Sequence, residues 1–206
     1  PLRRQRQMCI RDRLSDRTTI IHATHLTGGD IAMIAASDTV VSLCPTTEAD
    51  LGDGIARVKD LQDAGVRLAI GTDEDVITDP FTELRMLEST ARLVTGTRGV
   101  IGCEALWKIG TRNGVESLRP AAEPLPRQTS TPGPGSAGLA AGDPADIVVV
   151  EPSSARLAGV DPTRWPLVAT ANDVAATIVA GEWNRLDAAV AEDLRHVLDE
   201  LRGRDS

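Results

Sequence analysis

Short apolar runs alternate with amphipathic stretches over residues 18–118 of this chain. Runs rich in β-branched and aliphatic residues predict buried strands, at 18–23, 39–45 and 66–73. Apolar residues at helical spacing predict helices, at 54–65 and 79–94, and a helical stretch at 101–118 that breaks near 110–114. Buried strands that alternate with helices pair in parallel, so the pattern predicts an α/β fold. It fits an open doubly wound sheet or part of a (β/α)₈ barrel.

Capping residues indicate where helices begin and end. Thr27 is followed three residues later by Asp30, which is typical of a capping box, so we expect a further helix to begin there. Asp79 stands before Pro80, the residue type favoured at the first helical position. Gly65 is placed to end the helix at 54–65.

The composition changes after residue 118. Residues 120–137 are rich in proline and predict a linker or a surface insertion. Residues 146–150 predict a strand, and 173–186 a strand, a turn and a second strand. Residues 187–206 carry the apolar spacing of a C-terminal amphipathic helix.

The composition of the chain bears on its binding partners and on the cellular compartment in which it folds. The chain is 41% hydrophobic with a net charge of −8, which argues against nucleic-acid binding by bulk electrostatics. It contains no run of 18 apolar residues, so we expect no membrane partner. Three cysteines, Cys9, Cys44 and Cys103, show no CxxC spacing, which favours a reducing, cytoplasmic setting.

A basic run, RRQRQMCIRDR at residues 3–13, contrasts with the acidic remainder of the chain. The codons of a widely used transposase sequencing adapter translate into the same order of residues without a gap. We therefore interpret residues 1–13 as a translated artefact and leave them out of the reasoning on the fold.

Polar side chains follow each of the first three predicted strands. His22 stands near the end of the first, and Asp73 and Glu74 follow the third; those after the second are Cys44, Thr46, Thr47 and Glu48. Active sites of parallel α/β folds lie at the carboxyl ends of strands. A histidine in a strand is more often structural, and Cys44 has no base near it in the sequence, so it is a weak nucleophile candidate. His22 and Asp73 are the residue types that metal-assisted hydrolysis needs.

Four motifs give the chain a resemblance to a known family. They occur in the order IIHATHLT, SLCPTTEADLGDGI, IGTDEDVITDPFTELRMLE and GLAAGDPADIVVVEP. Together they resemble the C-terminal half of amidohydrolase-superfamily enzymes, and within that superfamily the formimidoylglutamate deiminases of histidine degradation. SLCPTTEADLGDGI is the most specific of the four, and the resemblance covers residues 18–185.

The resemblance implies a (β/α)₈ barrel with an attached β-sandwich. Residues 14–119 would supply barrel strands six to eight with their helices, and 138–186 part of the β-sandwich. His22 matches the catalytic acid/base after the sixth strand, and Asp73 matches the metal ligand and proton acceptor after the eighth. The implied cofactor is one divalent metal ion, with zinc expected. The implied reaction converts N-formimidoyl-L-glutamate, a small-molecule substrate, to N-formyl-L-glutamate and ammonia, and the family allows a homodimer.

Two departures from the family pattern keep other functions open. Glu74 and Asp75 stand where the family has Ser followed by Asn or His, and their charge would suit a purine, pyrimidine or guanidino-type substrate better. The HxH motif and the later His with its nearby Glu, which supply the other metal ligands, do not occur in the chain. We therefore expect this chain alone to be inactive and poorly stable. A non-catalytic binding module is a third interpretation.

Overall fold

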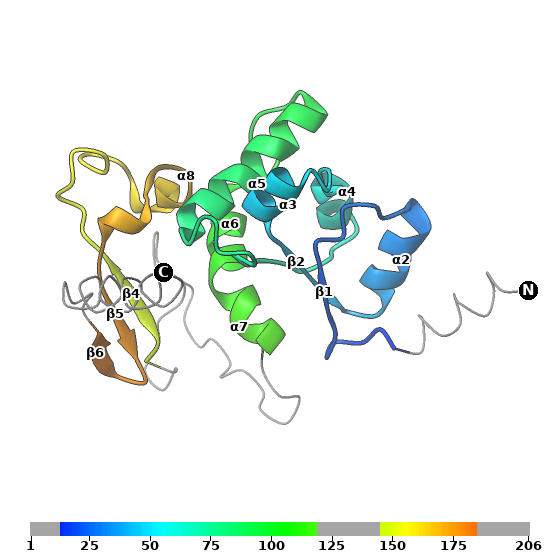
Figure 1. Cartoon of the computed structure of the whole chain (residues 1–206), viewed down its shortest axis with the longest axis horizontal. Helices are drawn as coiled ribbons and strands as arrows, with labels where there is room; N and C mark the ends of the chain where they lie inside the picture. Colours follow the sequence, from blue (N-terminus) through cyan, green and yellow to red (C-terminus); the bar gives the residue numbers. More distant parts are fainter. Residues whose placement is uncertain (1–12, 119–144, 185–206) are drawn as a thin grey trace, which may run out of the picture.

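The computed structural model describes residues 13–118 and 145–184, which form two small sheets with helices between them (Figure 1). The proline-rich stretch predicted at 120–137, the helix predicted at 187–206 and nearly all of the segment 1–13 lie outside the described residues.

The first sheet is parallel, as the alternating pattern predicts. Its strands lie in the order β1-β2-β3, with the bounds β1 (Thr19–Ile21), β2 (Val40–Leu43) and β3 (Leu68–Ile70). All four residues of β2 are buried because this strand lies between the other two. The prediction of a buried first strand is wrong. β1 lies outermost in the described sheet, its residues are half-buried or exposed, and Ile21 is 49% exposed.

Helices connect the parallel strands. α2 (Gly28–Ala36) links β1 to β2, and the capping box of Thr27 and Asp30 forms at its start as predicted. Two shorter helices, α3 (Pro45–Leu51) and α4 (Val58–Asp63), link β2 to β3. The helix predicted from residue 54 begins only at Val58. Gly54 has φ +100°, a conformation that a right-handed helix does not contain.

Three helices follow β3. α5 (Pro80–Thr95) begins after Asp79, whose carboxylate accepts from the N–H of Phe81, so the predicted helix start is confirmed. α6 (Cys103–Gly110) and α7 (Arg112–Leu118) are separated at Thr111, within the predicted break. Gly110 lets α6 approach α5 closely, because a Cβ there would lie 2.8 Å from Leu84 Cδ1. Of the helices in the described ranges, none is both long and apolar enough to cross a bilayer.

The second sheet is antiparallel and has the order β4-β5-β6. Its strands are β4 (Ile147–Val150), β5 (Val174–Val179) and β6 (Glu182–Asn184). The predicted strand, turn and strand at 173–186 are therefore confirmed. Between β4 and β5 lie η1 (Pro162–Arg164), α8 (Trp165–Val168) and η2 (Ala171–Asp173).

Helices α5 and α6 lie between the two sheets (Figure 1). The guanidinium of Arg85 on α5 donates to the carbonyl oxygens of Leu167 and Ala169 at 3.1 and 2.5 Å. Phe81 and Trp107 meet edge to face with ring centroids 6.3 Å apart. These contacts hold the end of α8 against α5. The hydrogen bonds to main-chain carbonyls thus add to the packing of a small apolar cluster at the same place.

The main core is aliphatic and packs around the parallel sheet. Its most deeply buried members include Leu43 of β2, Leu61 of α4 and Leu106 of α6, each with no exposed surface. Because Phe and Trp are scarce, the free energy of folding depends on close packing of Leu, Ile and Val.

Leu106→Ala tests this dependence, with Leu93→Ala as a control on another helix. Leu106 is 0% exposed and Leu93 is 81% exposed. We expect Leu106→Ala to lower the free energy of unfolding by about 2–5 kcal/mol, because it leaves a cavity. Leu93→Ala should change it by less than about 0.5 kcal/mol. Urea unfolding of the chain and its variants measures both, and equal effects would contradict this assignment of the core.

Candidate functional site

Parallel pairing brings the segments that follow β1, β2 and β3 to one edge of the sheet. The hydrogen-bond ladder continues past the strand ends. The N–H of His22 donates to the carbonyl of Ser42 at 2.9 Å, and the N–H of Gly71 donates to the carbonyl of Leu43 at 3.0 Å. The backbone therefore fixes His22 beside the end of β2. On the other side of β2 the ladder ends at Gly71, and Asp73 follows two residues later.

The backbone turns sharply at His22. The N–H of Ala23 donates to the carbonyl of Ile21 at 2.9 Å, which is the hydrogen-bond pattern of a γ-turn with His22 at its centre. His22 and Ala23 both have positive φ, at 66° and 52°. Such a conformation is unfavourable for residues with a Cβ and concentrates at functional sites. The chain therefore leaves β1 at His22 in a strained backbone conformation.

Asp73 lies in a turn that its neighbours close. The N–H of Asp75 donates to the carbonyl of Thr72, and the hydroxyl of Thr72 donates to Oδ1 of Asp75 at 2.6 Å. The hydroxyl of Thr47 on α3 also donates to the carbonyl of Thr72, at 3.2 Å. Asp73 has φ 51°, a left-handed conformation that aspartate tolerates better than most residues.

The two residues predicted to carry the chemistry lie close together. His22 Nε2 and Asp73 Oδ2 are 3.6 Å apart. One atom each of His22, Cys44 and Asp73 that could bind a metal lies within 4.8 Å of the others. Nitrogen, sulfur and carboxylate oxygen are the donors that zinc accepts in proteins. The set therefore has suitable chemistry for a transition-metal ion.

Cys44 is buried at the N-terminus of α3. Burial, with a smaller contribution from the nearby carboxylates of Asp73, Glu48 and Glu83, raises the pKa of its thiol to about 11. A thiol with so high a pKa holds little thiolate at neutral pH. This agrees with the expectation that Cys44 is a poor nucleophile.

A buried carboxylate, Glu48 of α3, lies on the other side of His22. Its Oε1 accepts from the N–H of Cys44 at 2.9 Å and lies 3.5 Å from His22 Nδ1. Burial raises the pKa of Glu48, and this effect outweighs the opposing influence of the Cys44 N–H and of His22. His22 therefore lies between two carboxylates, Glu48 facing Nδ1 and Asp73 facing Nε2.

A second buried carboxylate holds α3 in place from a distant part of the sequence. Glu83 of α5 accepts from the N–H of Thr46 at 3.1 Å and from the hydroxyl of the same residue. Burial raises the pKa of Glu83, more than these two hydrogen bonds lower it. Glu83 thus joins α5 to the first turn of α3, the helix that carries Glu48.

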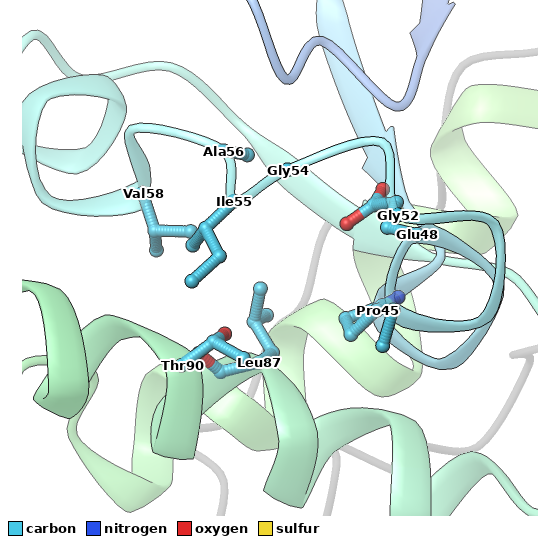
Figure 2. Close-up of a pocket in the computed structure, with 10 residues that line it drawn as sticks. Pro45, Glu48, Gly52, Gly54, Ile55, Ala56, Val58, Leu87 and Thr90 are labelled. Atoms are coloured by element: carbon cyan, nitrogen blue, oxygen red, sulfur yellow. The ribbon is translucent and has the colours of Figure 1, made fainter.

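A pocket of about 300 Å³ lies between α3, the segment 52–58 and α5 (Figure 2). Figure 2 shows Ile55 and Val58 on one side and Leu87 and Thr90 on the other. Glu48 lines this pocket, whereas His22, Cys44 and Asp73 do not. The pocket therefore meets the candidate site at Glu48 alone.

The sequence identified part of this arrangement. His22 and Asp73 were predicted as site residues, and they are neighbours in space; their catalytic roles stay predictions. Glu48 was noted only as a residue after the second strand, and Glu83 was not noted. Pro45 as the first residue of a helix was the available signal for α3, with Glu48 one turn on. No pattern linked Glu83 to Thr46, because the two lie 37 residues apart.

Residues 5–120 match the family model described as the amidohydrolase family. The chain belongs to the amidohydrolase family. The match begins within the segment 3–13, whose interpretation as a translated adapter stays a prediction.

Curated members of the family include enzymes with different substrates in their names. The formimidoylglutamate deiminase of Pseudomonas aeruginosa is 32% identical to this chain, over 93% of the chain and 40% of that protein. A 5-methylthioadenosine/S-adenosylhomocysteine deaminase of Halobacterium salinarum is 29% identical, over 93% of the chain and 44% of that protein. The chain thus spans less than half the length of these amidohydrolases.

A solved structure shows the same fold. The crystal structure of an adenosine deaminase from Xanthomonas campestris with bound zinc aligns with a TM-score of 0.75 at 23% identity. The alignment covers 98% of this amidohydrolase chain and 46% of the other. The fold of this chain is therefore similar to that of a solved structure that contains zinc.

Glu83→Gln tests the buried link between α5 and α3. A carboxyl group whose pKa is raised by folding stabilises the fold most below the ordinary glutamate pKa of about 4.3, and this contribution is lost as pH rises through the raised value. Gln keeps an acceptor for the Thr46 N–H but does not ionise. As the pH rises from 4 to 8, we therefore expect Glu83→Gln to gain stability relative to the wild type.

Urea unfolding at several pH values measures this difference. Glu74→Gln, which removes a charge from an exposed glutamate, is the matched control and should follow the wild-type pH dependence. Parallel curves for Glu83→Gln and wild type would contradict the raised pKa of Glu83.

Proposed function

We propose that this chain supplies three barrel strands and part of the small β domain of a metal-dependent formimidoylglutamate deiminase. In this proposal β1, β2 and β3 are the sixth, seventh and eighth strands of a (β/α)₈ barrel, and β4 to β6 belong to the β-sandwich. Membership of the amidohydrolase family and the 32% identity to the Pseudomonas deiminase support it. The intact enzyme would hydrolyse N-formimidoyl-L-glutamate to N-formyl-L-glutamate and ammonia.

The juxtaposition of His22 and Asp73 is the observation that carries this proposal. Their nearest polar side-chain atoms are 3.6 Å apart at the carboxyl edge of a parallel sheet. Active sites of (β/α)₈ enzymes are built at that edge from residues that follow different strands. An imidazole and a carboxylate at this separation can both exchange protons with one water molecule as it attacks a substrate carbon.

Asp73 would be the ligand that this chain contributes to a divalent metal ion, with zinc expected. A carboxylate oxygen is a donor that zinc accepts, and further possible ligand atoms of His22 and Cys44 lie within 4.8 Å. When bound, such an ion polarises a water molecule and lowers its pKa towards 7. Asp73 would both hold the ion and accept a proton from the water molecule.

The two side chains would share the proton transfers. Hydrolysis of the formimidoyl group replaces its C=N bond with C=O, and both hydrogens of the attacking water end on the departing nitrogen as ammonia. Asp73 would accept the first proton as the water attacks and pass it to the imino nitrogen of the tetrahedral intermediate. His22 would take the second proton from the hydroxyl of that intermediate and deliver it to the same nitrogen as the C–N bond breaks, so that ammonia leaves and both residues return to their starting state.

A second candidate function is deamination of a purine nucleoside. The Halobacterium relative is named as such a deaminase, and Glu74 and Asp75 place two further carboxylates in the sequence next to Asp73. Added negative charge favours a neutral or cationic substrate over one with two carboxylates.

Ammonia release distinguishes the two candidate functions. The protein is expressed from the complete reading frame that includes residues 14–206 and is supplied with each substrate in turn. We expect ammonia from N-formimidoyl-L-glutamate and none from 5′-methylthioadenosine or adenosine. Removal of metal with a chelator should abolish the activity, and zinc should restore it. The reverse preference between the substrates would exclude the deiminase.

A matched pair of substitutions tests the role of Asp73. Asp73→Asn and Asp75→Asn remove the same charge from neighbouring residues that both have positive φ, which asparagine tolerates. We expect Asp73→Asn to lower kcat by about 10²–10⁴-fold, because its amide neither accepts the proton nor binds metal well. Asp75→Asn keeps an acceptor for Thr72 and should retain most of the activity. Equal losses in the two variants would refute the role assigned to Asp73.

A further inference from the structure

The two ring nitrogens of His22 face carboxylates in different surroundings. Nε2 lies 3.6 Å from Asp73, whose side chain is 43% exposed, whereas Nδ1 lies 3.5 Å from Glu48, whose side chain is 6% exposed. Nδ1 is itself buried, and within the described ranges no atom forms a hydrogen bond with it. Leaving a buried polar atom without a hydrogen-bond partner costs free energy, so an acceptor that forms a hydrogen bond with Nδ1 is strongly favoured.

Glu48 Oε1 can only act as an acceptor toward Nδ1. The same oxygen already accepts from the N–H of Cys44 at 2.9 Å, so its lone pairs point toward donors. If Glu48 takes up a proton, the proton goes to Oε2, because Oε1 is turned toward an N–H group. Nδ1 of His22 must therefore carry hydrogen to interact with Glu48.

The position of Glu48 is fixed by its helix and not by His22. The N–H of Glu48 donates to the carbonyl of Cys44 at 2.9 Å, while its carboxylate returns to the N–H of Cys44. Glu83 holds the first turn of α3 through Thr46. The carboxylate is thus preorganised, and its Oε1 is 3.5 Å from Nδ1, a little beyond the range of about 2.7–3.2 Å for an N–H···O hydrogen bond. Hydrogen bonds of this kind are often long in the free protein and shorten when substrate binds.

We propose that Glu48 is a positioning residue for His22. Its Oε1 accepts a hydrogen bond from Nδ1–H and so holds the neutral imidazole in the tautomer with an unprotonated Nε2 facing Asp73. The preference comes from a buried oxygen whose other partner is a backbone N–H. The resemblance to known enzymes points to His22 and Asp73, whereas this role comes from the contacts of α3.

The tautomer would also matter for the reaction, and this part of the inference rests on the proposed function. A histidine that accepts a proton at Nε2 must have a lone pair there, and the Nδ1–H tautomer supplies it. Glu48 would thereby favour the tautomer in which the lone pair of Nε2 is free to accept a proton.

The tautomer can be measured without any assay of activity. Two-bond ¹H–¹⁵N spectra distinguish a protonated ring nitrogen from an unprotonated one. The intact protein is labelled with ¹⁵N at histidine and studied at pH 8, and the His22 signals are assigned by their loss in His22→Asn. We expect Nδ1 of His22 to be the protonated nitrogen and Nε2 the unprotonated one. The opposite pattern in the wild-type protein would overturn the proposal.

Two substitutions of Glu48 separate its role as an acceptor from its role in packing. Glu48→Gln keeps a carbonyl oxygen that can accept from Cys44 and His22, so we expect the Nδ1–H tautomer to persist. Glu48→Leu removes the acceptor, so the ratio of Nδ1–H to Nε2–H should fall about two- to tenfold, the effect of one hydrogen bond. Asp50→Leu, at an exposed position on the same helix, should leave the ratio unchanged.

Each outcome decides the proposal. An unchanged tautomer ratio in Glu48→Leu would refute it, as would a loss of the Nδ1–H form in Glu48→Gln. If Glu48→Leu does not fold, the wild-type and Glu48→Gln spectra still give the answer. In kinetics, Glu48→Leu should lower kcat about 10- to 100-fold with little change in KM. A different substrate for the enzyme would change which assay is used but not the spectra, so failure of the proposed function is separately visible.

Discussion

Parallel pairing of β1, β2 and β3 is the constraint on which the candidate site depends. The ladder extends beyond the strands through the N–H groups of His22 and Gly71, so the first residues after β1 and β3 have fixed places beside β2. His22 and Asp73 are 51 residues apart in the numbering, and only this register brings their side chains to 3.6 Å. A slip of one residue would turn His22 to the opposite face of the sheet.

Buried glutamates hold the segments around this sheet. Glu48, Glu83 and Glu88 each accept from a backbone N–H, of Cys44, Thr46 and Ile101 respectively. Burial of a carboxylate is costly, and these hydrogen bonds offset part of that cost. In return, a carboxylate fixes the direction of a backbone N–H more narrowly than apolar packing does. The edge of the sheet that carries His22 and Asp73 is therefore supported by polar contacts that lie inside the molecule.

Much of the fold followed from local patterns, and the support of the site did not. Periodicity and capping residues located α2, α5 and the strands, because each signal lies within a few residues. The helix α3 was missed because Pro45 was interpreted as the end of a strand and not as the first residue of a helix. The contact of Glu83 with Thr46 depends on how α5 packs, which no single stretch of sequence specifies. The same holds for the burial of Glu48 beside His22.

The structure also changes the weight of the two acidic residues after Asp73. In the sequence they suggest a site that repels a substrate with two carboxylates. Asp75, however, accepts a hydrogen bond from the hydroxyl of Thr72 at 2.6 Å, so its carboxylate takes part in closing the turn. Glu74 is exposed, and water and salt screen its charge over distances of about 8–10 Å. In the proposed function, the charge nearest the substrate would be that of Asp73, which a bound metal ion would counter. Glu74 and Asp75 are therefore compatible with the dicarboxylate substrate of the proposed deiminase.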